Sequence, residues 1–136
     1  MVNVAVTAAG GGVGQSIIKC LSGTEYRSIA IDPDRRAAGL YMAYDFRLGA
    51  TIENEVNFID RLLAICKETD CKYVLSGFDA ELPIQDRHRE KFTAENITLV
   101  LSSSHVVNLS YNILFLVIYM DQEGIQGYIP TYSTAE

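Results

Sequence analysis

The chain has 136 residues, with 11 Lys and Arg against 17 Asp and Glu, and a formal net charge of -6. This acidic balance argues against a nucleic-acid partner, because a phosphate-binding surface needs clustered basic residues. Its length suits one compact domain, and 49% hydrophobic residues exclude a disordered chain.

Short apolar runs that end in polar or glycine-rich residues predict buried strands of a parallel sheet. They cover residues 2–7, 28–32, 72–76 and 97–101, with a weaker fifth run at 46–48. Helical patterns alternate with them, at residues 14–21, 54–68, 81–92 and 105–123. This alternation predicts an α/β fold: a three-layer Rossmann-like domain with a central, mainly parallel sheet and flanking helices.

Four glycines, Gly10, Gly11, Gly12 and Gly14, follow the first predicted strand. They approach the G-x-G-x-x-G dinucleotide fingerprint but do not match it, because their spacing is G-x-G-x-G. Glycines here let a phosphate come close to the backbone, or let the first helix come close to the sheet. We expect an anion or ligand to contact this loop, with ligand-free helix packing in a dimeric protein as the alternative.

Asp32 ends the second predicted strand, where an acidic side chain can accept a hydrogen bond from a ribose hydroxyl. The following D-P-D-R-R segment is equally typical of a solvated turn. If Asp32 binds a ribose, or if Arg35 and Arg36 bind a 2'-phosphate, the chain is the NAD(P)-binding domain of an oxidoreductase. That is the alternative function.

The segment SGFDAEL lies at the carboxyl end of a central predicted strand, where open α/β sheets bind their ligands. Gly77 leaves room for a ligand, and Asp79 and Glu81 can accept from amines or hydroxyls. The predicted substrate-binding residues are therefore Ser76, Gly77, Asp79 and Glu81. Asp79 has a second interpretation, as the N-cap of the next helix. No catalytic triad or metal-ligand set appears in these loops, so no catalytic residue is predicted.

The last predicted helix contains ILFLVIYM, an unbroken apolar run at residues 113–120. A membrane span needs about 20 such residues, so no membrane contact is expected. A helix that is apolar on all sides must be buried on all sides. We therefore expect residues 105–123 to contact a second copy of the chain or a partner domain.

The chain begins with a strand pattern and lacks the features of a secretory signal, so we expect a cytoplasmic protein. Its three cysteines, Cys20, Cys66 and Cys71, are odd in number and scattered, which does not suit a disulfide framework. No further cysteine or histidine pair follows at zinc-ligand spacing. We expect buried or partly buried free thiols and no metal site.

Four segments together resemble the N-terminal, pre-ATP-grasp domain of ATP-grasp ligases, particularly proteins similar to the carbamoyl phosphate synthase large subunit. They are VAVTAAGGGVGQSIIKCL, IDPDRRAAGLYMAYDF, FIDRLLAICKETDCKYVLSGFDAELPIQDRHREKF and ITLVLSSSHVV. The resemblance implies a substrate-side Rossmann-like domain over residues 1–124. Residues 125–136 would then begin a linker towards an ATP-grasp module that this chain lacks.

The resemblance also implies that such ligases activate a carboxylate as an acyl phosphate, which an amine then attacks. ATP and magnesium are expected mainly in the absent module, so this chain is expected to bind a small substrate or anion at most and to be inactive alone. In relatives, a lysine that helps to bind ATP phosphates follows the SS turn. Here the corresponding positions are Tyr111, Asn112 and Ile113, and isoleucine cannot neutralise a phosphate.

Overall fold

The computed structural model describes residues 1–132. The chain divides into two compact units, Met1–Leu101 and Ser102–Glu136, which are described separately here. The predicted linker at residues 125–136 lies within the second unit, and its last four residues fall outside the described part of the chain. The predicted boundary at residue 124 therefore stays a prediction.

The first unit contains a five-stranded sheet with the order β3-β2-β1-β4-β5, and every pair of neighbouring strands is parallel. The strands are β1 (Val2–Thr7), β2 (Tyr26–Asp32), β3 (Asp45–Leu48), β4 (Cys71–Ser76) and β5 (Thr98–Leu99). This confirms the predicted Rossmann-like fold. The chain builds the sheet outward from β1 to β3 and then crosses to β4, so the strand order reverses between β1 and β4.

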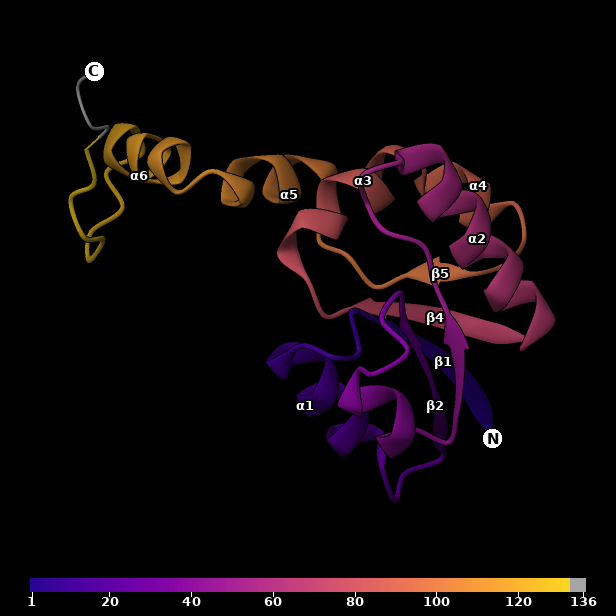
Figure 1. Cartoon of the computed structure of the whole chain (residues 1–136). Coiled ribbons are helices and arrows are strands. Elements are labelled where there is room, and N and C mark those ends of the chain that lie inside the picture. Colours follow the sequence, from indigo (N-terminus) through magenta and orange to yellow (C-terminus); the bar gives the residue numbers. More distant parts are fainter. Residues whose placement is uncertain (133–136) are drawn as a thin grey trace. The chain divides into compact units, whose positions relative to one another are not determined.

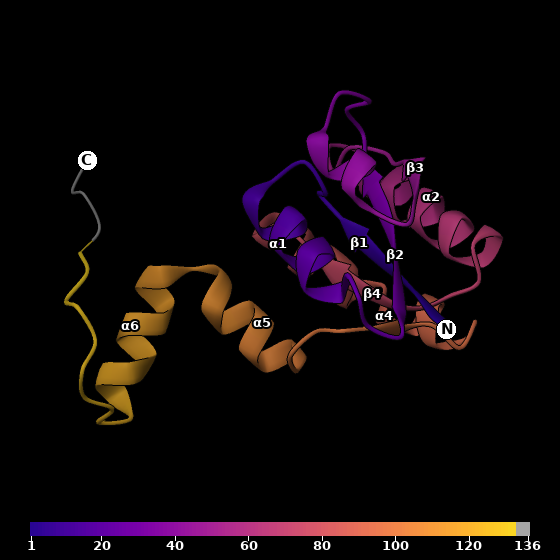
Figure 2. The same ribbon diagram turned by 90° about the horizontal axis from the view of Figure 1, so that it is seen from below.

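Helices cover both faces of the sheet (Figures 1 and 2). On one face lie α1 (Gly12–Leu21) and the short 3-10 helix η1 (Ala38–Met42). On the other lie α2 (Glu55–Glu68), α3 (Leu82–Arg87) and α4 (Arg89–Thr93). The predicted helices at residues 14–21 and 54–68 are therefore present, with small differences at their starts.

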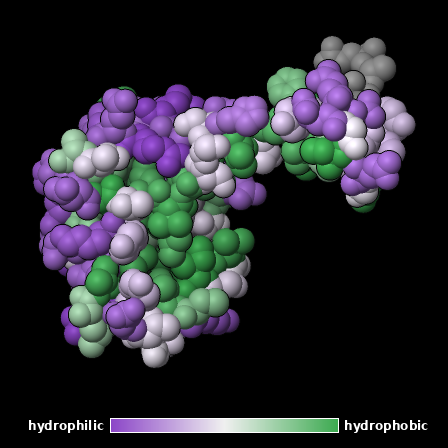
Figure 3. Space-filling view, turned by 180° about the vertical axis from the view of Figure 1, so that it is seen from behind, coloured by the Kyte–Doolittle hydropathy of each residue, from purple (hydrophilic) through white to green (hydrophobic). Residues whose placement is uncertain are grey.

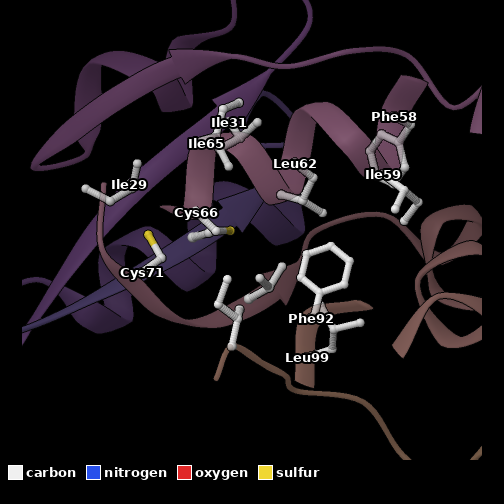
Figure 4. Close-up of a cluster of buried hydrophobic side chains, with 13 residues drawn as sticks. Ile29, Ile31, Phe58, Ile59, Leu62, Ile65, Cys66, Cys71, Phe92 and Leu99 are labelled. Atoms are coloured by element: carbon white, nitrogen blue, oxygen red, sulfur yellow. The ribbon is translucent and has the colours of Figure 1, made fainter. Parts of the chain in front are cut away.

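The larger hydrophobic core lies between α2 and the sheet (Figure 4). Phe58, Leu62 and Ile65 are all buried because their spacing places them on one face of α2. Phe92 of α4 completes this core and is fully buried. A smaller core forms under α1, where Ile18 packs with residues of β1, β2 and η1.

The three thiols occupy different environments. Cys66 and Cys71 are buried in the larger core, as expected, whereas Cys20 is exposed on α1. The hydrogen bond with Cys71 raises the pKa of Cys66, and burial raises that pKa further. All three cysteines are free in the structure, in agreement with the prediction of unpaired thiols.

The helix predicted at residues 81–92 is interrupted. The structure has η2 (Asp79–Glu81), then α3, then α4, with a break at His88, whose φ of -111° and ψ of 14° are not helical. Glu55, at the start of α2, contacts both residues at the break. Its carboxylate accepts from Arg87 Nη2 at 2.6 Å and lies 2.8 Å from His88 Nε2. The periodicity of a single segment could not reveal these contacts with another helix.

The helix predicted at residues 105–123 is also two helices, α5 (Ser104–Tyr111) and α6 (Ile113–Gln122). Asn112 separates them in an extended conformation, with φ -115° and ψ 108°. Its side chain accepts from the backbone N–H groups of Leu114 and Phe115, so it caps α6. The prediction of one helix was wrong because it treated Asn112 as a helix-interior residue.

We expect Asn112→Ala to destabilise α6 by about 1 kcal/mol, the usual cost of losing a side-chain cap. The measurement is amide hydrogen exchange of the α6 residues. Asn108→Ala is the matched control, because Asn108 lies within α5 and bonds only to its own helix, at Ser104 O. Equal α6 protection in both variants would contradict the capping role.

No side chain of α6 is buried, and Ile113 and Phe115 are 66% and 59% exposed. The apolar run thus remains open within the second unit. Among the described residues, no helix is long and apolar enough to cross a membrane.

Hydrophobic side chains also gather on the first unit, where Figure 3 shows a broad apolar area. Two adjoining hollows beside α1 share Leu21 and Leu75. Tyr73 and Val100 line one of them and are 39% and 50% exposed, because α1 covers only part of this face of the sheet.

Candidate functional site

Two predicted loops meet at the carboxyl edge of the sheet. The glycine loop follows β1 and the segment from Ser76 to Glu81 follows β4. These strands are neighbours, with Thr7 opposite Ser76. The Gly77 N–H donates to Thr7 O at 3.1 Å, which fastens one loop to the end of the other strand. This edge is also where the strand order reverses, the usual position of ligand sites in open α/β sheets.

The glycines of these loops have two different roles. A Cβ atom on Gly14 would lie 2.4 Å from Ala8 O, and one on Gly77 would lie 2.8 Å from Gly14 Cα. These two glycines are therefore needed for close packing of backbone segments. Gly12 is different, because a Cβ there would have no atom within 4 Å. A Cβ on Gly11 would make only ordinary contacts, the nearest at 3.4 Å.

The glycine loop turns tightly before α1 begins. Ala8 has a φ of +47°, a conformation that favours glycine, and its carbonyl accepts from Gly11 N–H at 3.1 Å. Helix α1 then starts at Gly12, and its N-cap Gly11 supplies no side-chain acceptor. The first N–H groups of a helix lack partners within the helix and attract anions. The open side of the loop can therefore receive an oxyanion.

Asp32 fastens the glycine loop to the end of β2. Its side chain is buried, Oδ2 accepts from Gly10 N–H at 2.8 Å, and Oδ1 accepts from Asp34 N–H at 2.9 Å. A Cβ on Gly10 would lie 2.8 Å from Ala37 Cβ and 3.1 Å from Asp32 Oδ2, which explains the glycine at this position. Binding of a ribose by Asp32 stays a prediction. The observed contacts give it a bracing role.

Glu81 lies beneath the two loops and is only 5% exposed. Its Oε2 accepts from Thr7 Oγ1, from Ser76 Oγ at 2.7 Å and from Gln85 Nε2 at 3.2 Å. Burial raises the pKa of the Glu81 carboxyl, while its hydrogen bonds to Thr7 and Ser76 oppose that rise. Direct binding of a substrate by Glu81 stays a prediction. The geometry makes it an internal brace between β1, β4 and α3.

Asp79 is the acidic residue of this segment that faces solvent. It is the first residue of η2, whereas α3 begins at Leu82 with Glu81 in the N-cap position. The alternative interpretation of Asp79, as the N-cap of the helix that follows, is therefore wrong for α3. Its exposed carboxylate, next to the partly exposed Ser76 and Gly77, can accept from an amine or hydroxyl of a ligand.

Sequence reasoning missed three residues that shape this site. Gly39 in η1 packs against the glycine loop, where a Cβ would lie 1.8 Å from Ala9 O. Thr7 and Gln85 supply hydrogen bonds to Glu81. The four-residue spacing of Glu81 and Gln85 was the available signal for that pair, because it places both on one helix face. Within residues 1–132, no group of three or more His, Cys, Asp or Glu side chains is arranged to hold a metal.

Several solved structures share this fold. N5-carboxyaminoimidazole synthetase from Staphylococcus aureus, solved with ADP, has a TM-score of 0.66 and 16% identity, over 90% of this chain and 30% of that one. The biotin carboxylase subunit of pyruvate carboxylase has a TM-score of 0.66 and 15% identity, over 91% of this chain and 28% of that one. The glycinamide-RNase-transformylase T structure from Mycobacterium tuberculosis has a TM-score of 0.65 and 16% identity, over 90% and 32%.

This chain thus spans about a third of the length of each of these proteins. Because the sequence identities are low, the likeness shows a shared fold alone. No curated protein matches the sequence. Residues 5–100, which contain both site loops and all of the sheet except the first three residues of β1, match the family described as PylC-like, N-terminal domain. The chain therefore belongs to the PylC-like N-terminal domain family.

Proposed function

We propose that this chain is the substrate-side N-terminal domain of an ATP-grasp carboxylate-amine ligase, with carbamoyl phosphate synthase-like proteins as the narrower possibility. The observation that carries this proposal is the family match over residues 5–100. The short span of this chain relative to its structural relatives supports a part of a larger enzyme.

The carboxyl edge of the sheet gives this domain a defined role. The unpartnered N–H groups at the start of α1 would bind a carboxylate or phosphate oxygen of the substrate. Asp79 would accept from its amine or hydroxyl group, and Glu81 would hold the two loops in register. ATP and magnesium would bind in a module outside this chain, so the chain alone would catalyse no ligation.

The test is an NMR titration of the ¹⁵N-labelled chain with inorganic phosphate, magnesium ATP, NADH and NADPH. We expect phosphate to shift the amide signals of Gly12 and Val13 in a saturable way. Steady-state turnover of ATP by this chain alone would contradict the proposal. Saturable binding of NADH or NADPH, but not of phosphate, would instead establish the dinucleotide-binding alternative.

Gly12→Val is the decisive variant for this site. A Cβ at residue 12 would meet no atom within 4 Å, so we expect the valine side chain to enter the open side of the loop without disturbing the packing. We expect phosphate binding to weaken at least about tenfold while the melting temperature stays within about 4 °C of the parent. Unchanged phosphate affinity in this variant would contradict binding at the loop.

We further propose that the exposed apolar helix α6 contacts a second copy of the chain. Its side chains Ile113, Phe115 and Ile118 are between 44% and 66% exposed, which favours association of such helices. Light scattering at low micromolar concentration should give about twice the 15.0 kDa mass of one chain. Phe115→Ser with Ile118→Ser should return it to a monomer, and a strictly monomeric parent would contradict the proposal.

A further inference from the structure

Another hollow lies at the opposite, amino-terminal edge of the sheet. Its volume is about 350 Å³, within the range of small-molecule sites. The end of α1, the start of β2 and the segment after η1 form its walls, which include Ile18, Leu21, Arg27, Ser28, Met42 and Tyr44. Because β2 runs from Tyr26 to Asp32, the hollow lies about 20 Å from the glycine loop.

Arg27 is the unusual residue of this hollow. Its Nε atom is buried and has no hydrogen-bond partner, one of only two such side-chain atoms among residues 1–132. Buried donors of this kind normally have an acceptor, so the missing acceptor calls for an explanation. The ion pairs found in the described part of the chain also leave Arg27 without a carboxylate partner.

Tyr44 holds the guanidinium group of Arg27 in place. The Arg27 Cζ atom lies 4.5 Å from the centre of the Tyr44 ring, in a cation-π contact. The contact positions the positive charge but satisfies no N–H donor, so the guanidinium can still donate to an acceptor in the hollow.

The remaining walls define the kind of ligand. Among the residues that the structure describes, no Asp or Glu lines the hollow, although the chain as a whole has a net charge of -6. Ile18, Leu21 and Met42 provide apolar surface. Ser28 Oγ accepts from Tyr44 N–H at 3.4 Å, which leaves its hydroxyl hydrogen available to donate. One fixed cation, a hydroxyl donor and apolar walls suit a small organic anion.

We propose that this hollow binds a small carboxylate or phosphate ester, with the oxyanion on Arg27 and the apolar body against Leu21 and Met42. The site is separate from the carboxyl edge of the sheet and does not depend on the function proposed for that edge. The oxyanion accepts from the terminal Nη groups of Arg27, because protein atoms cover the Nε atom itself.

The test is an NMR titration of the ¹⁵N-labelled chain that follows the Arg27 Nε–H signal and the amides of residues 22–28 and 44. Benzoate and phenyl phosphate are the probes, and they distinguish a carboxylate from a phosphate ligand. Benzamide is the neutral control of the same size, and inorganic phosphate lacks the apolar body. We expect saturable shifts in these signals with benzoate or phenyl phosphate below about 10 mM, and weaker ones with the controls.

Arg27→Gln should raise the dissociation constant of the bound probe at least about tenfold, because it removes the charge and the forked donors. Lys19→Gln is the matched control. It removes the same charge from an exposed residue of α1 that does not line the hollow, so affinity should stay within about twofold. If Arg27→Gln does not fold, Arg27→Lys and Tyr44→Leu replace it, and each should weaken binding at least about threefold.

Three results would overturn the proposal. The first is the absence of any saturable shift at residues 22–28 and 44 below about 10 mM probe. The second is equal binding of benzamide and benzoate, which would show that the charge plays no part. The third is unchanged affinity in the Arg27 variants. Shifts confined to the glycine loop would also overturn the proposal, because they would show that the probe binds at the carboxyl edge of the sheet and not in this hollow.

Discussion

Gly14→Ala is expected to lower the free energy of unfolding by about 3 kcal/mol, the upper range for overpacking a core position. The added methyl carbon would lie 2.4 Å from Ala8 O and 2.9 Å from Ala9 Cα. Both neighbours are backbone atoms of the turn between β1 and α1, so they cannot move aside as a flexible side chain can. Urea denaturation measures the change.

Gly12→Ala is the control for this prediction. It lies two residues earlier in the same helix, and its Cβ would meet no atom within 4 Å. We expect stability to be unchanged or raised by up to about 1 kcal/mol, because alanine is the better helix former. If both variants lose the same stability, the loop itself rejects side chains, and the distinction between packing glycines and open glycines is wrong.

Glu81→Leu is expected to lower the free energy of unfolding by about 2 to 3 kcal/mol. Thr7 Oγ1, Ser76 Oγ and Gln85 Nε2 all donate to Glu81 Oε2, and the leucine side chain offers them no acceptor. Asp79→Ala is the control, because this exposed carboxylate lies two residues away. It should change stability by no more than about 0.5 kcal/mol. Equal losses would show that Glu81 does not brace the loops.

The same residue predicts a pH dependence. Burial raises the pKa of Glu81 above its ordinary value of 4.5, so the folded state holds this proton more tightly than the unfolded chain. The stability that folding gains from the protonated Glu81 carboxyl is therefore fully present below pH 4.5. It is lost as the pH rises through the raised pKa of Glu81. Glu81→Gln has no titrating proton at this position. As the pH rises from 4.5, its free energy of unfolding should therefore fall less than that of the parent protein. Parallel pH profiles for the two proteins would contradict the assignment.

The comparison with Glu81→Gln is needed because other carboxylates act in the opposite direction. Hydrogen bonds from Arg87 and His88 lower the pKa of Glu55 to about 2. Its contribution is present above pH 4.5 and is lost as the pH falls towards 2. The difference between parent and variant removes this shared background.

At the carboxyl edge, the sequence singled out two loops that the structure places side by side, but it did not indicate the structural role of each residue. The glycine pattern and SGFDAEL are local signals, and the structure brings both segments together at neighbouring strand ends. Gly12 and Gly14 look alike in sequence, yet one is open and the other touches the preceding turn. Asp79 and Glu81 are both acidic, yet one faces solvent and the other is buried.

Sequence alone determined the parallel α/β fold and the covered face of α2, because strand and helix periodicities are properties of neighbouring residues. The ordered segments that span most of the chain resembled carbamoyl phosphate synthase-like proteins, whereas the family match is to PylC-like N-terminal domains. Only the tertiary structure decided that Glu81 braces two strands, that Glu55 contacts the break between α3 and α4, and that Arg27 lines a hollow without an acceptor. Each of these depends on side chains from segments far apart in the chain, and no local pattern records which distant segments meet.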